Sequence, residues 1–273
     1  MPIAEATDGA KIHYRALGAG PPLLLCNAAF ATCAHWSAQE EALARRFRVV
    51  TWDYRGHGAS EAPAEAERYS LKQVVADLRA VHRAATDDAP AFVGGLSVGG
   101  LVTLSYALTH PEQVRALLLF NTGPGFKNPE ALAQWQAMLE RAASKMEEVG
   151  LARYLEGRRA QAELLGLHPQ SKLARAVRES VLTSSVEGLT CFARGVAGPV
   201  PNLVDRLAEI RVPCLVVVGE HDAAFQRASQ VLVAKLPRAQ RVVLKDAGHV
   251  LQLDQPEAFV REVERFAEGA QDL

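Results

Sequence analysis

The 273-residue sequence predicts an α/β fold with a mostly parallel sheet of eight strands, helices on both faces of that sheet and a helical insertion. Short apolar runs alternate with longer segments that have the periodicity of amphipathic helices. This alternation is typical of parallel sheets whose strands are joined by helices. One stretch, residues 125–201, has helical patterns but no strand candidate, and it therefore predicts the insertion.

Two features indicate how the strands are arranged. Asp8-Gly9 separates the first two candidates, which favours an antiparallel hairpin at the start of the sheet. The run Leu23–Cys26 is apolar at every position, as expected of a strand buried on both faces. The predicted strands are Ile3–Ala6, Lys11–Leu17, Leu23–Cys26, Phe47–Trp52, Ala91–Gly94, Val114–Phe120, Cys214–Val218 and Arg241–Leu244.

The helical segments divide the chain into a core and an insertion. The predicted core helices are Ser37–Arg46, Ser70–Ala85, Val98–Thr109, Phe225–Lys235 and Pro256–Glu268. We expect residues 1–124 and 202–273 to form the core, and residues 125–201 to form a helical cap interrupted at Gly150, Gly157, Gly166, Pro169, Gly188 and Gly198. Such an insertion is either a lid over a site or a purely structural subdomain, and the sequence leaves both open.

The composition excludes several classes of protein. Thirty basic and thirty-one acidic residues give a net charge of −1 without a basic cluster, which argues against a nucleic-acid partner. The apolar runs are too short to span a membrane, and the N-terminus lacks a signal-peptide pattern, so we expect a cytoplasmic protein. The four cysteines have no metal-ligand spacing, and we expect small buried side chains, with no disulfide and no metal site.

The strongest chemical signal is the segment Gly95-Leu96-Ser97-Val98-Gly99. It follows a predicted strand and precedes a predicted helix, which is the context of a nucleophile elbow. In that turn a serine projects from a strained backbone above the sheet, and small neighbours are needed where strand and helix cross. The segment therefore predicts that Ser97 is a nucleophile.

A serine nucleophile needs a base and an acid that orients the base. Asp222 follows the strand candidate that ends at Val218, and His249 follows the one that ends at Leu244. Strand carboxyl ends share one edge of a parallel sheet, which is where such sheets carry their sites. We therefore expect Ser97, Asp222 and His249 to meet there.

Other residues near these positions are weaker candidates. Glu220 lies inside its turn, and Asp246 is too close to His249 in sequence to reach its far nitrogen easily. His221 precedes the acid, which breaks the order serine, acid, histidine. Asn121, which follows another strand, has no charge to offer.

With these residues in order, the chain resembles the α/β-hydrolase superfamily over nearly its full length. The segment 53–60, Asp-Tyr-Arg-Gly-His-Gly-Ala-Ser, resembles the D-x-R-G-x-G-x-S loop after the family's fourth strand. Ser97, Asp222 and His249 match the family's triad positions, and Trp36 matches an aromatic residue of its first helix. The resemblance implies that His57 is a structural loop residue.

The oxyanion loop departs from the commonest pattern of that family. Many members have His-Gly after the third strand, whereas this chain has Asn27-Ala28-Ala29-Phe30, which is similar to enol-lactonase-like members. The resemblance implies that the backbone N–H groups of Ala29 and Val98 form the oxyanion hole. We expect Asn27 to hold this loop by hydrogen bonding.

These features predict a serine hydrolase that cleaves a small carboxylic ester or lactone and needs no cofactor. The partner is a small molecule with an apolar acyl or alkyl group, for which the candidate wall residues are Phe30, Trp36, Phe126, Trp135 and Met138. The same triad could serve a carbon–carbon bond hydrolase or lyase, and the segment 219–225 resembles lyase-type members of menaquinone synthesis. A ligand receptor with slow turnover is a third hypothesis, and the oligomeric state is open.

Overall fold

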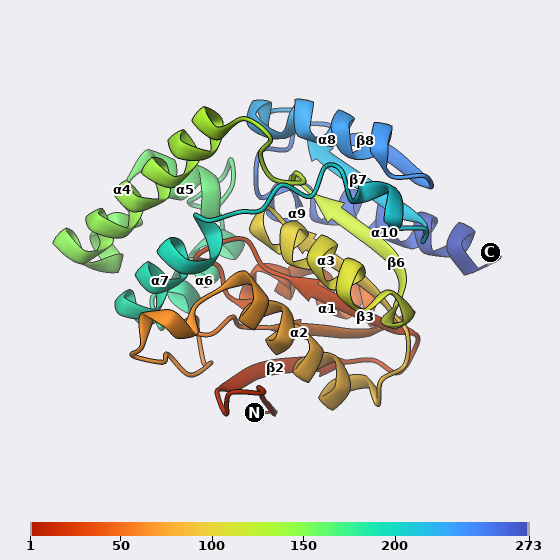
Figure 1. Cartoon of the computed structure of the whole chain (residues 1–273), viewed down its shortest axis with the longest axis horizontal. Helices are drawn as coiled ribbons and strands as arrows, with labels where there is room; N and C mark the ends of the chain where they lie inside the picture. The colour runs from red at the N-terminus through yellow and green to blue at the C-terminus, as the bar shows by residue number, and fades with distance from the viewer. Residues whose placement is uncertain (1, 272–273) are drawn as a thin grey trace.

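The computed structural model describes residues 2–271 and contains an eight-stranded sheet with helices on both faces (Figure 1). The strand order is β1-β2-β4-β3-β5-β6-β7-β8. β2 is antiparallel to β1 and β4, and every other neighbouring pair is parallel. This arrangement confirms the predicted fold class. The strands are β1 Ile3–Glu5, β2 Lys11–Leu17, β3 Pro22–Cys26, β4 Arg48–Trp52, β5 Ala91–Leu96, β6 Val114–Phe120, β7 Cys214–Gly219 and β8 Ala239–Leu244.

The central strands are apolar because both of their faces are covered. β5 and β7 are buried at all six of their positions. α1 and α10 pack together on one face, whereas α2, α3 and α8 cover the other (Figure 1). The core helices are α1 Ser37–Leu43, α2 Leu71–Thr86, α3 Val98–Thr109, α8 Ala223–Lys235, the short α9 Leu251–Asp254 and α10 Pro256–Gln271.

α2 illustrates how local sequence sets these helices. Ser70 caps its start by accepting a hydrogen bond from the backbone N–H of Gln73 at 3.3 Å. Val74, Leu78 and Val81 recur at helical spacing and are buried. The helix ends where Asp87 adopts a left-handed conformation, with φ of 50°.

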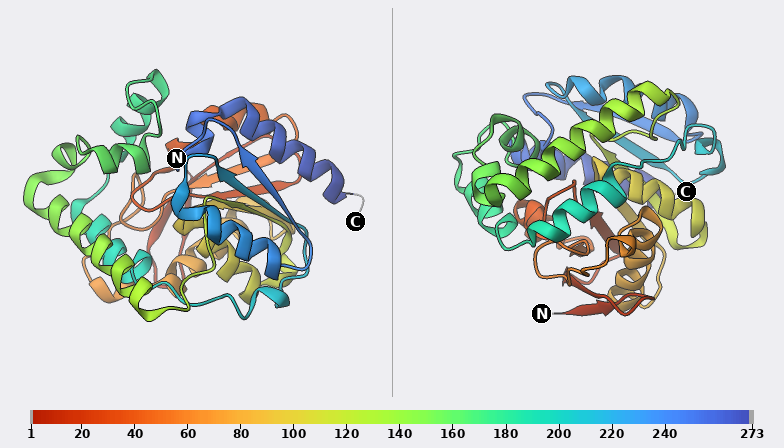
Figure 2. Two further views of the ribbon diagram at one scale, coloured as in Figure 1. Left: turned by 90° about the horizontal axis from the view of Figure 1, so that it is seen from above. Right: turned by 60° about the vertical axis from the view of Figure 1, so that its left-hand side comes forward.

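The segment 125–201 forms a group of helices beyond the carboxyl ends of the strands (Figure 2). Its elements are α4 Pro129–Tyr154, α5 Arg158–Leu164, α6 Lys172–Val181, α7 Val186–Phe192 and the π-helical turn η4 Ala193–Ala197. The predicted break at Gly150 is present as a kink with φ of 76°. The predicted break at Gly188 is wrong, because this glycine lies inside α7 and an added Cβ would come within 2.5 Å of the Cα of Gly56.

Hydrogen bonds hold these helices against the sheet domain. The hydroxyls of Thr32 and Ser180 lie 2.7 Å apart, and Ser184 Oγ accepts from the N–H of Gly58 at 2.9 Å. These two contacts hold the end of α6 and the turn before α7 against the loops that follow β3 and β4. The segment 125–201 is thus bonded to loops that lie close to the strand ends.

Two further expectations concern the whole chain. Within residues 2–271 no helix combines the length and the apolar character that crossing a bilayer requires. All four cysteines are free: Cys26, Cys33 and Cys214 are buried, whereas Cys191 is partly exposed, unlike the buried side chain that we expected.

Candidate active site

Ser97 occupies the turn between β5 and α3 in a conformation that side chains rarely adopt, with φ of 56° and ψ of −118°. Backbone strain of this kind costs about 1–3 kcal/mol and persists only where neighbours enforce it. Here the Ser97 N–H donates to the carbonyl of Phe120 at 2.9 Å, and the hydroxyl of Thr122 donates to the Ser97 carbonyl at 2.6 Å. The end of β6 therefore holds the serine in place.

The glycines around Ser97 allow the strand and the helix to cross closely. A Cβ on Gly95 would lie 2.2 Å from the backbone of Gly99, and one on Gly99 would lie 2.5 Å from the carbonyl oxygen of Asn27. The obstructing atoms are all backbone, which cannot move aside as a side chain could. The spacing of the G-x-S-x-G motif therefore has a direct steric cause.

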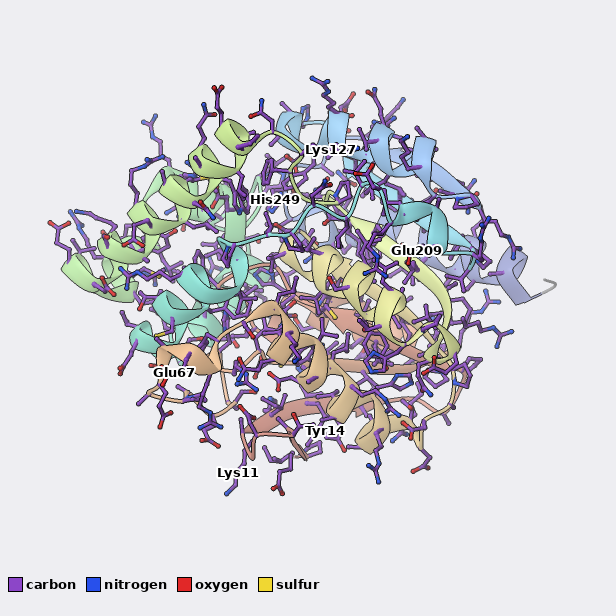
Figure 3. The ribbon with its side chains drawn as sticks, in the orientation of Figure 1. Lys11, Tyr14, Glu67, Lys127, Glu209 and His249 are labelled. Carbon is purple, nitrogen blue, oxygen red and sulfur yellow. The ribbon has the colours of Figure 1, made fainter. Side chains whose placement is uncertain are left out.

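Asp222 and His249 are joined by a hydrogen bond of 2.7 Å between Oδ2 and Nδ1. Asp222 lies just after β7 and is buried, and His249 lies in the loop after β8. His249 is half-buried, and in the view of Figure 3 it falls within the outline of the molecule, whereas Lys11 and Glu67 lie at its edge. Glu220, the weaker acid candidate, is exposed and accepts instead from the N–H of Asp246.

Ser97 opens onto an apolar cavity of about 240 Å³. Its wall contains Leu101, Phe126, Trp135 and Phe225, and none of the described lining residues is charged. Of the five candidate wall residues, Phe126 and Trp135 line this cavity. Phe30 and Trp36 are buried in the core, and Met138 lines a different groove, which is described below.

Phe225 connects this cavity to the histidine. Its ring stacks on His249 with centroids 5.3 Å apart and 26° between the planes, and it also lines the cavity beside Ser97. The structure thus brings the three predicted residues to one region. Across residues 2–271, however, no hydrogen bond joins Ser97 Oγ to His249.

The loop after β3 is held by Asn27, as we expected. Its side-chain nitrogen donates to the carbonyl of Trp52 at 2.6 Å, and its side-chain oxygen accepts from the indole N–H of Trp36 at 2.8 Å. The hydroxyl of Tyr54 donates to the Asn27 carbonyl at 2.7 Å. This network fixes the backbone that leads to Ala29.

The two N–H groups predicted as oxyanion donors belong to Ala29 and Val98. Neither donates a hydrogen bond to another residue of the described chain. Val98 is the first residue of α3, so its N–H has no partner within the helix. Phe30, next to Ala29, has a φ of 63°, which turns the loop sharply at this point.

Asn121 has a structural role that the sequence analysis missed. We had considered this residue only as a candidate for the acid, a role for which it lacks a charge. Its side-chain nitrogen donates to the carbonyls of Gly248 and His249 at 2.8 Å each, and its oxygen accepts from the N–H of Gly219 at 2.8 Å. The side chain therefore ties the histidine loop to the end of β7. The available signal was a polar amide directly after an apolar strand.

Asp254 is a second residue that the sequence analysis did not identify. Its carboxylate accepts from the N–H of Gly248 at 2.8 Å and from the N–H of Leu167 at 2.7 Å. Burial raises the pKa of this carboxyl, and the two hydrogen bonds oppose that rise. Asp254 thus joins the histidine loop to the segment between α5 and α6.

The loop 53–60 is a structural support, as the resemblance implied for His57. Burial would raise the pKa of Asp53, but hydrogen bonds from His13, Cys33 and Ala59 outweigh it and lower that pKa. Arg55 is buried and makes two hydrogen bonds to Asp77 at 2.7 and 2.8 Å. These contacts anchor the loop, and the bond from Cys33 links it to the segment that follows β3.

His57 and His35 are fully buried, and burial lowers the pKa of each to about 4. Both side chains are therefore neutral near pH 7. Two groups of potential metal ligands exist among the described residues, one around Asp53 and one at the exposed Glu220. Asp53 already accepts three hydrogen bonds, so its surroundings fit a structural carboxylate rather than a metal ligand.

The mostly parallel sheet, with Ser97, Asp222 and His249 placed after three of its strands, is typical of α/β hydrolases. Comparison with known proteins identifies the same class. A family model described as alpha/beta hydrolase fold matches residues 21–256. The chain belongs to the alpha/beta hydrolase fold family.

Relatives within this family have several activities. A provisionally named 2-succinyl-6-hydroxy-2,4-cyclohexadiene-1-carboxylate synthase of Bacillus subtilis (strain 168) is 32% identical over 80% of each chain. The enol-lactonase from Burkholderia xenovorans LB400 has a TM-score of 0.83 at 26% identity, with 98% of this chain and 100% of that chain covered. A thermophilic esterase from Thermogutta terrifontis has a TM-score of 0.87 at 25% identity, with 98% of both chains covered.

Proposed function

We propose that this protein is a serine hydrolase that cleaves a small carboxylic ester or lactone through an acyl-enzyme on Ser97. The observation that carries the proposal is the Asp222–His249 hydrogen bond of 2.7 Å, whose histidine stacks on the aromatic ring beside Ser97. A carboxylate bonded to Nδ1 leaves Nε2 as the nitrogen that exchanges a proton with the serine. The hydrogen bond between such a serine and its histidine often tightens only when substrate is bound.

The chemistry follows from these roles. Ser97 Oγ attacks the substrate carbonyl carbon while His249 Nε2 takes the hydroxyl proton. The tetrahedral intermediate collapses, the bond to the alcohol oxygen breaks, and His249 returns the proton to that oxygen. Water then attacks the acyl-enzyme with the same base, which releases the acid and restores the Ser97 hydroxyl.

The N–H groups of Ala29 and Val98 are the proposed oxyanion donors. Both are free of partners in the described chain, and preorganised donors stabilise the charge that develops on the carbonyl oxygen. Losing one such donor typically costs about 3–4 kcal/mol in the transition state. The network around Asn27 supports this role because it limits movement of the loop.

The cavity supports an uncharged, apolar group as the part of the substrate next to Ser97. Its lining is aliphatic and aromatic, and a charged group entering it would lose hydration without an opposite charge to replace it. We propose that residues 125–201 act as the cap of this cavity, since Phe126, Trp135 and Val200 belong to its wall. Short acyl chains suit its volume of about 240 Å³.

The Bacillus subtilis relative makes lyase chemistry the second candidate. The product in its name carries a carboxylate and a succinyl group, whereas the described cavity wall contains no basic residue to pair with them. We therefore favour ester or lactone cleavage. Hydrolysis of p-nitrophenyl esters from acetate to octanoate, compared with carbon–carbon bond cleavage of a meta-cleavage dienoate, separates the two reactions. Faster turnover of the dienoate would favour the carbon–carbon bond hydrolase or lyase.

Covalent labelling tests the nucleophile. A fluorophosphonate should modify Ser97, and Ser97→Ala should remove the adduct and lower kcat by at least about a thousandfold. Ser105→Ala is the matched control, because this serine lies on the same helix and its hydroxyl has no hydrogen-bond partner in the described chain. An adduct that persists in Ser97→Ala would reject the proposal.

A second pair of variants tests the base. His249→Ala should abolish both labelling and turnover, whereas His221→Ala should change neither by more than about twofold. His221 is exposed and adjacent to Asp222, so it controls for altered charge near the acid. Loss of activity in His221→Ala but not in His249→Ala would show that the base is His221 and that the assignment to His249 is wrong. A burst of one product equivalent without steady turnover would favour the slow receptor instead.

A further inference from the structure

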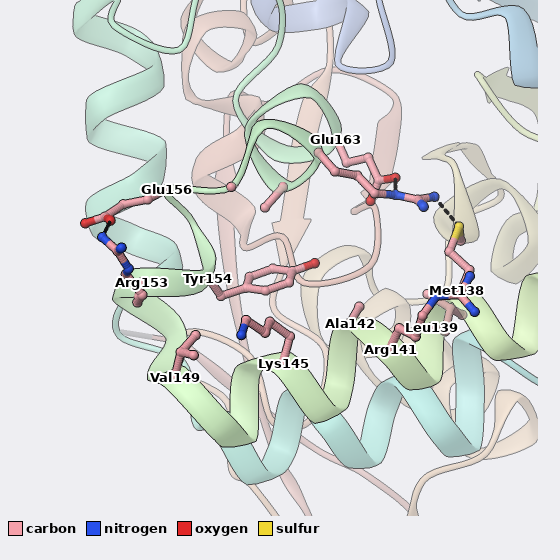
Figure 4. Close-up of a pocket in the computed structure, with 13 residues that line it drawn as sticks. Met138, Leu139, Arg141, Ala142, Lys145, Val149, Arg153, Tyr154, Glu156 and Glu163 are labelled. Atoms are coloured by element: carbon pink, nitrogen blue, oxygen red, sulfur yellow. Dashed lines mark hydrogen bonds and ion pairs between the residues drawn. The ribbon is translucent and has the colours of Figure 1, made fainter.

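A groove of about 760 Å³ lies between α4 and α5, and it shares no residue with the Ser97 cavity. Figure 4 shows the ring of Tyr154 lying across it, with Lys145 on the α4 side and Glu163 on the opposite side. Its volume falls within the range of about 300–1,000 Å³ that is usual for small-molecule sites. We call it the cap groove.

The lining of the cap groove is apolar in its middle and basic at its edges. Leu139, Ala142, Val149 and Ala160 provide the apolar surface together with the ring of Tyr154. Four basic residues and two acidic residues line it, which leaves an excess of two positive charges: Arg141, Lys145, Arg153 and Arg159 against Glu156 and Glu163. This combination matches a ligand that is partly apolar and negatively charged.

Not all of these cations are neutralised by the protein. Arg153 pairs with Glu156, and Arg159 pairs with Glu163 at 2.7 Å. Lys145 forms an ion pair with Glu148, three residues further along the helix, at 2.9 Å. Because this pair is exposed and contributes little free energy, a bound anion can replace Glu148 at little cost. Arg141 forms no ion pair with any described residue.

Tyr154 adds a hydroxyl to this groove. Its oxygen has no hydrogen-bond partner in the part of the chain that the structure describes, and burial raises the pKa of the phenol to about 12, so it remains a donor at neutral pH. An anion in the groove would therefore meet one neutral O–H donor as well as two cations.

We propose that the cap groove binds a small organic anion in which a carboxylate or phosphate group is attached to a hydrocarbon segment. Arg141 and Lys145 hold the anionic group, and the apolar surface formed by Leu139, Ala142 and the Tyr154 ring takes the hydrocarbon. This binding needs no chemistry at Ser97, so it can fail or succeed independently of the proposed hydrolase activity.

Calorimetric titration of the full chain with octanoate and with octyl phosphate tests the proposal. Octanoate should bind more tightly than octan-1-ol of the same chain length, and Arg141→Gln/Lys145→Gln should weaken it by at least about tenfold, the effect of one lost charged hydrogen bond. The matched control is Lys172→Gln/Arg261→Gln, which removes the same charge from exposed positions outside the groove and should change binding by less than twofold. Tighter binding of octyl phosphate than of octanoate would identify phosphate as the preferred group.

Fluorine NMR of the chain labelled with 3-fluorotyrosine locates the ligand. Tyr154→Phe assigns one of the five tyrosine signals, and octanoate should shift that signal more than the others. Circular dichroism melting shows whether each variant is folded. Equal affinity for octanoate in the Arg141/Lys145 variant and in its control would overturn the proposal, as would equal affinity for octanoate and octan-1-ol.

Discussion

Removing the side chain of Asn121 should both destabilise the protein and loosen its proposed catalytic base. The amide makes three hydrogen bonds of 2.8 Å to backbone groups of Gly219, Gly248 and His249, and it is 1% exposed. Asn121→Ala removes all three bonds. Two carbonyls and one N–H are then left in a buried region without a partner.

The magnitude follows from the number and burial of these bonds. Leaving a buried polar group without its partner costs about 1–3 kcal/mol, and water entering the space of the lost amide favours the lower part of that range. Three groups therefore give a loss of about 3–5 kcal/mol in the free energy of unfolding. Asn121 also has a φ of 39°, where alanine is less favourable than asparagine by about 1 kcal/mol.

Two further variants separate these contributions. Asn121→Gly loses the same bonds but tolerates the positive φ, so it should be about 1 kcal/mol more stable than Asn121→Ala. Asn121→Asp keeps an acceptor for the N–H of Gly219 but faces the carbonyls of Gly248 and His249 with a carboxylate, so it should also be destabilised.

The assay is urea unfolding followed by circular dichroism, combined with hydrolysis of p-nitrophenyl acetate by the folded variants. We expect kcat to fall by at least about tenfold in Asn121→Ala, since a small displacement of a catalytic group can cost about a hundredfold. An unfolding free energy within 1 kcal/mol of the parent, together with unchanged kcat, would refute the argument.

Three other predictions concern the support of the site. Gly99→Ala should lower the free energy of unfolding by about 3 kcal/mol or prevent folding, because its Cβ would lie 2.5 Å from the carbonyl oxygen of Asn27. Gly269→Ala is the control: it lies in α10 with open space around it, and it should raise the free energy of unfolding by about 0.5–1 kcal/mol. Thermal melting compares the two variants. Asp77→Asn should cost about 3 kcal/mol by urea unfolding, because it leaves the buried guanidinium of Arg55 with weaker pairing. Burial lowers the pKa of His35 and of His57 from 6.5 to about 4, so each binds a proton in the unfolded chain at a higher pH than in the folded chain. As the pH falls from 6.5 to 4, each histidine should therefore lower the free energy of unfolding by up to about 1.4 kcal/mol per pH unit. A free energy of unfolding by urea that stays constant between pH 6.5 and 4 would contradict this.

Local patterns were sufficient to predict most of the elements. Alternating apolar runs located all eight strands, and most errors were at boundaries: β8 begins at Ala239 rather than at Arg241, and α8 begins at Ala223 rather than at Phe225. The short helix α9 was not predicted. The start of β8 depends on pairing with its neighbour, because β8 extends to match β7 from Cys214 onward. Gly188 was misjudged for a related reason, since its close contact with Gly56 is tertiary and no local propensity reports it.

The site residues differ in how much local information they carry. Ser97 lies in a contiguous motif whose steric logic can be followed from sequence, and Asp222 and His249 each follow a recognisable strand. Asn121 has no such motif, because its partners are 98 to 128 residues away and all are backbone atoms. Backbone partners leave no signature in residue type, so only coordinates reveal the contact.

Asn121 and Asp254 hold the same loop by different means. Asn121 donates to the carbonyl of Gly248, and Asp254 accepts from its N–H, so both polar groups of that peptide position are bonded just before His249. The bond from Asn121 does not depend on pH, whereas Asp254 is ionisable and also holds the N–H of Leu167 in the insertion. Because burial raises the pKa of Asp254, acidification should protonate it before an ordinary carboxyl group and weaken the link to the insertion first. The loop that carries His249 after β8 is therefore held by Asn121, and Asp254 links it to the segment 125–201 through the N–H of Leu167.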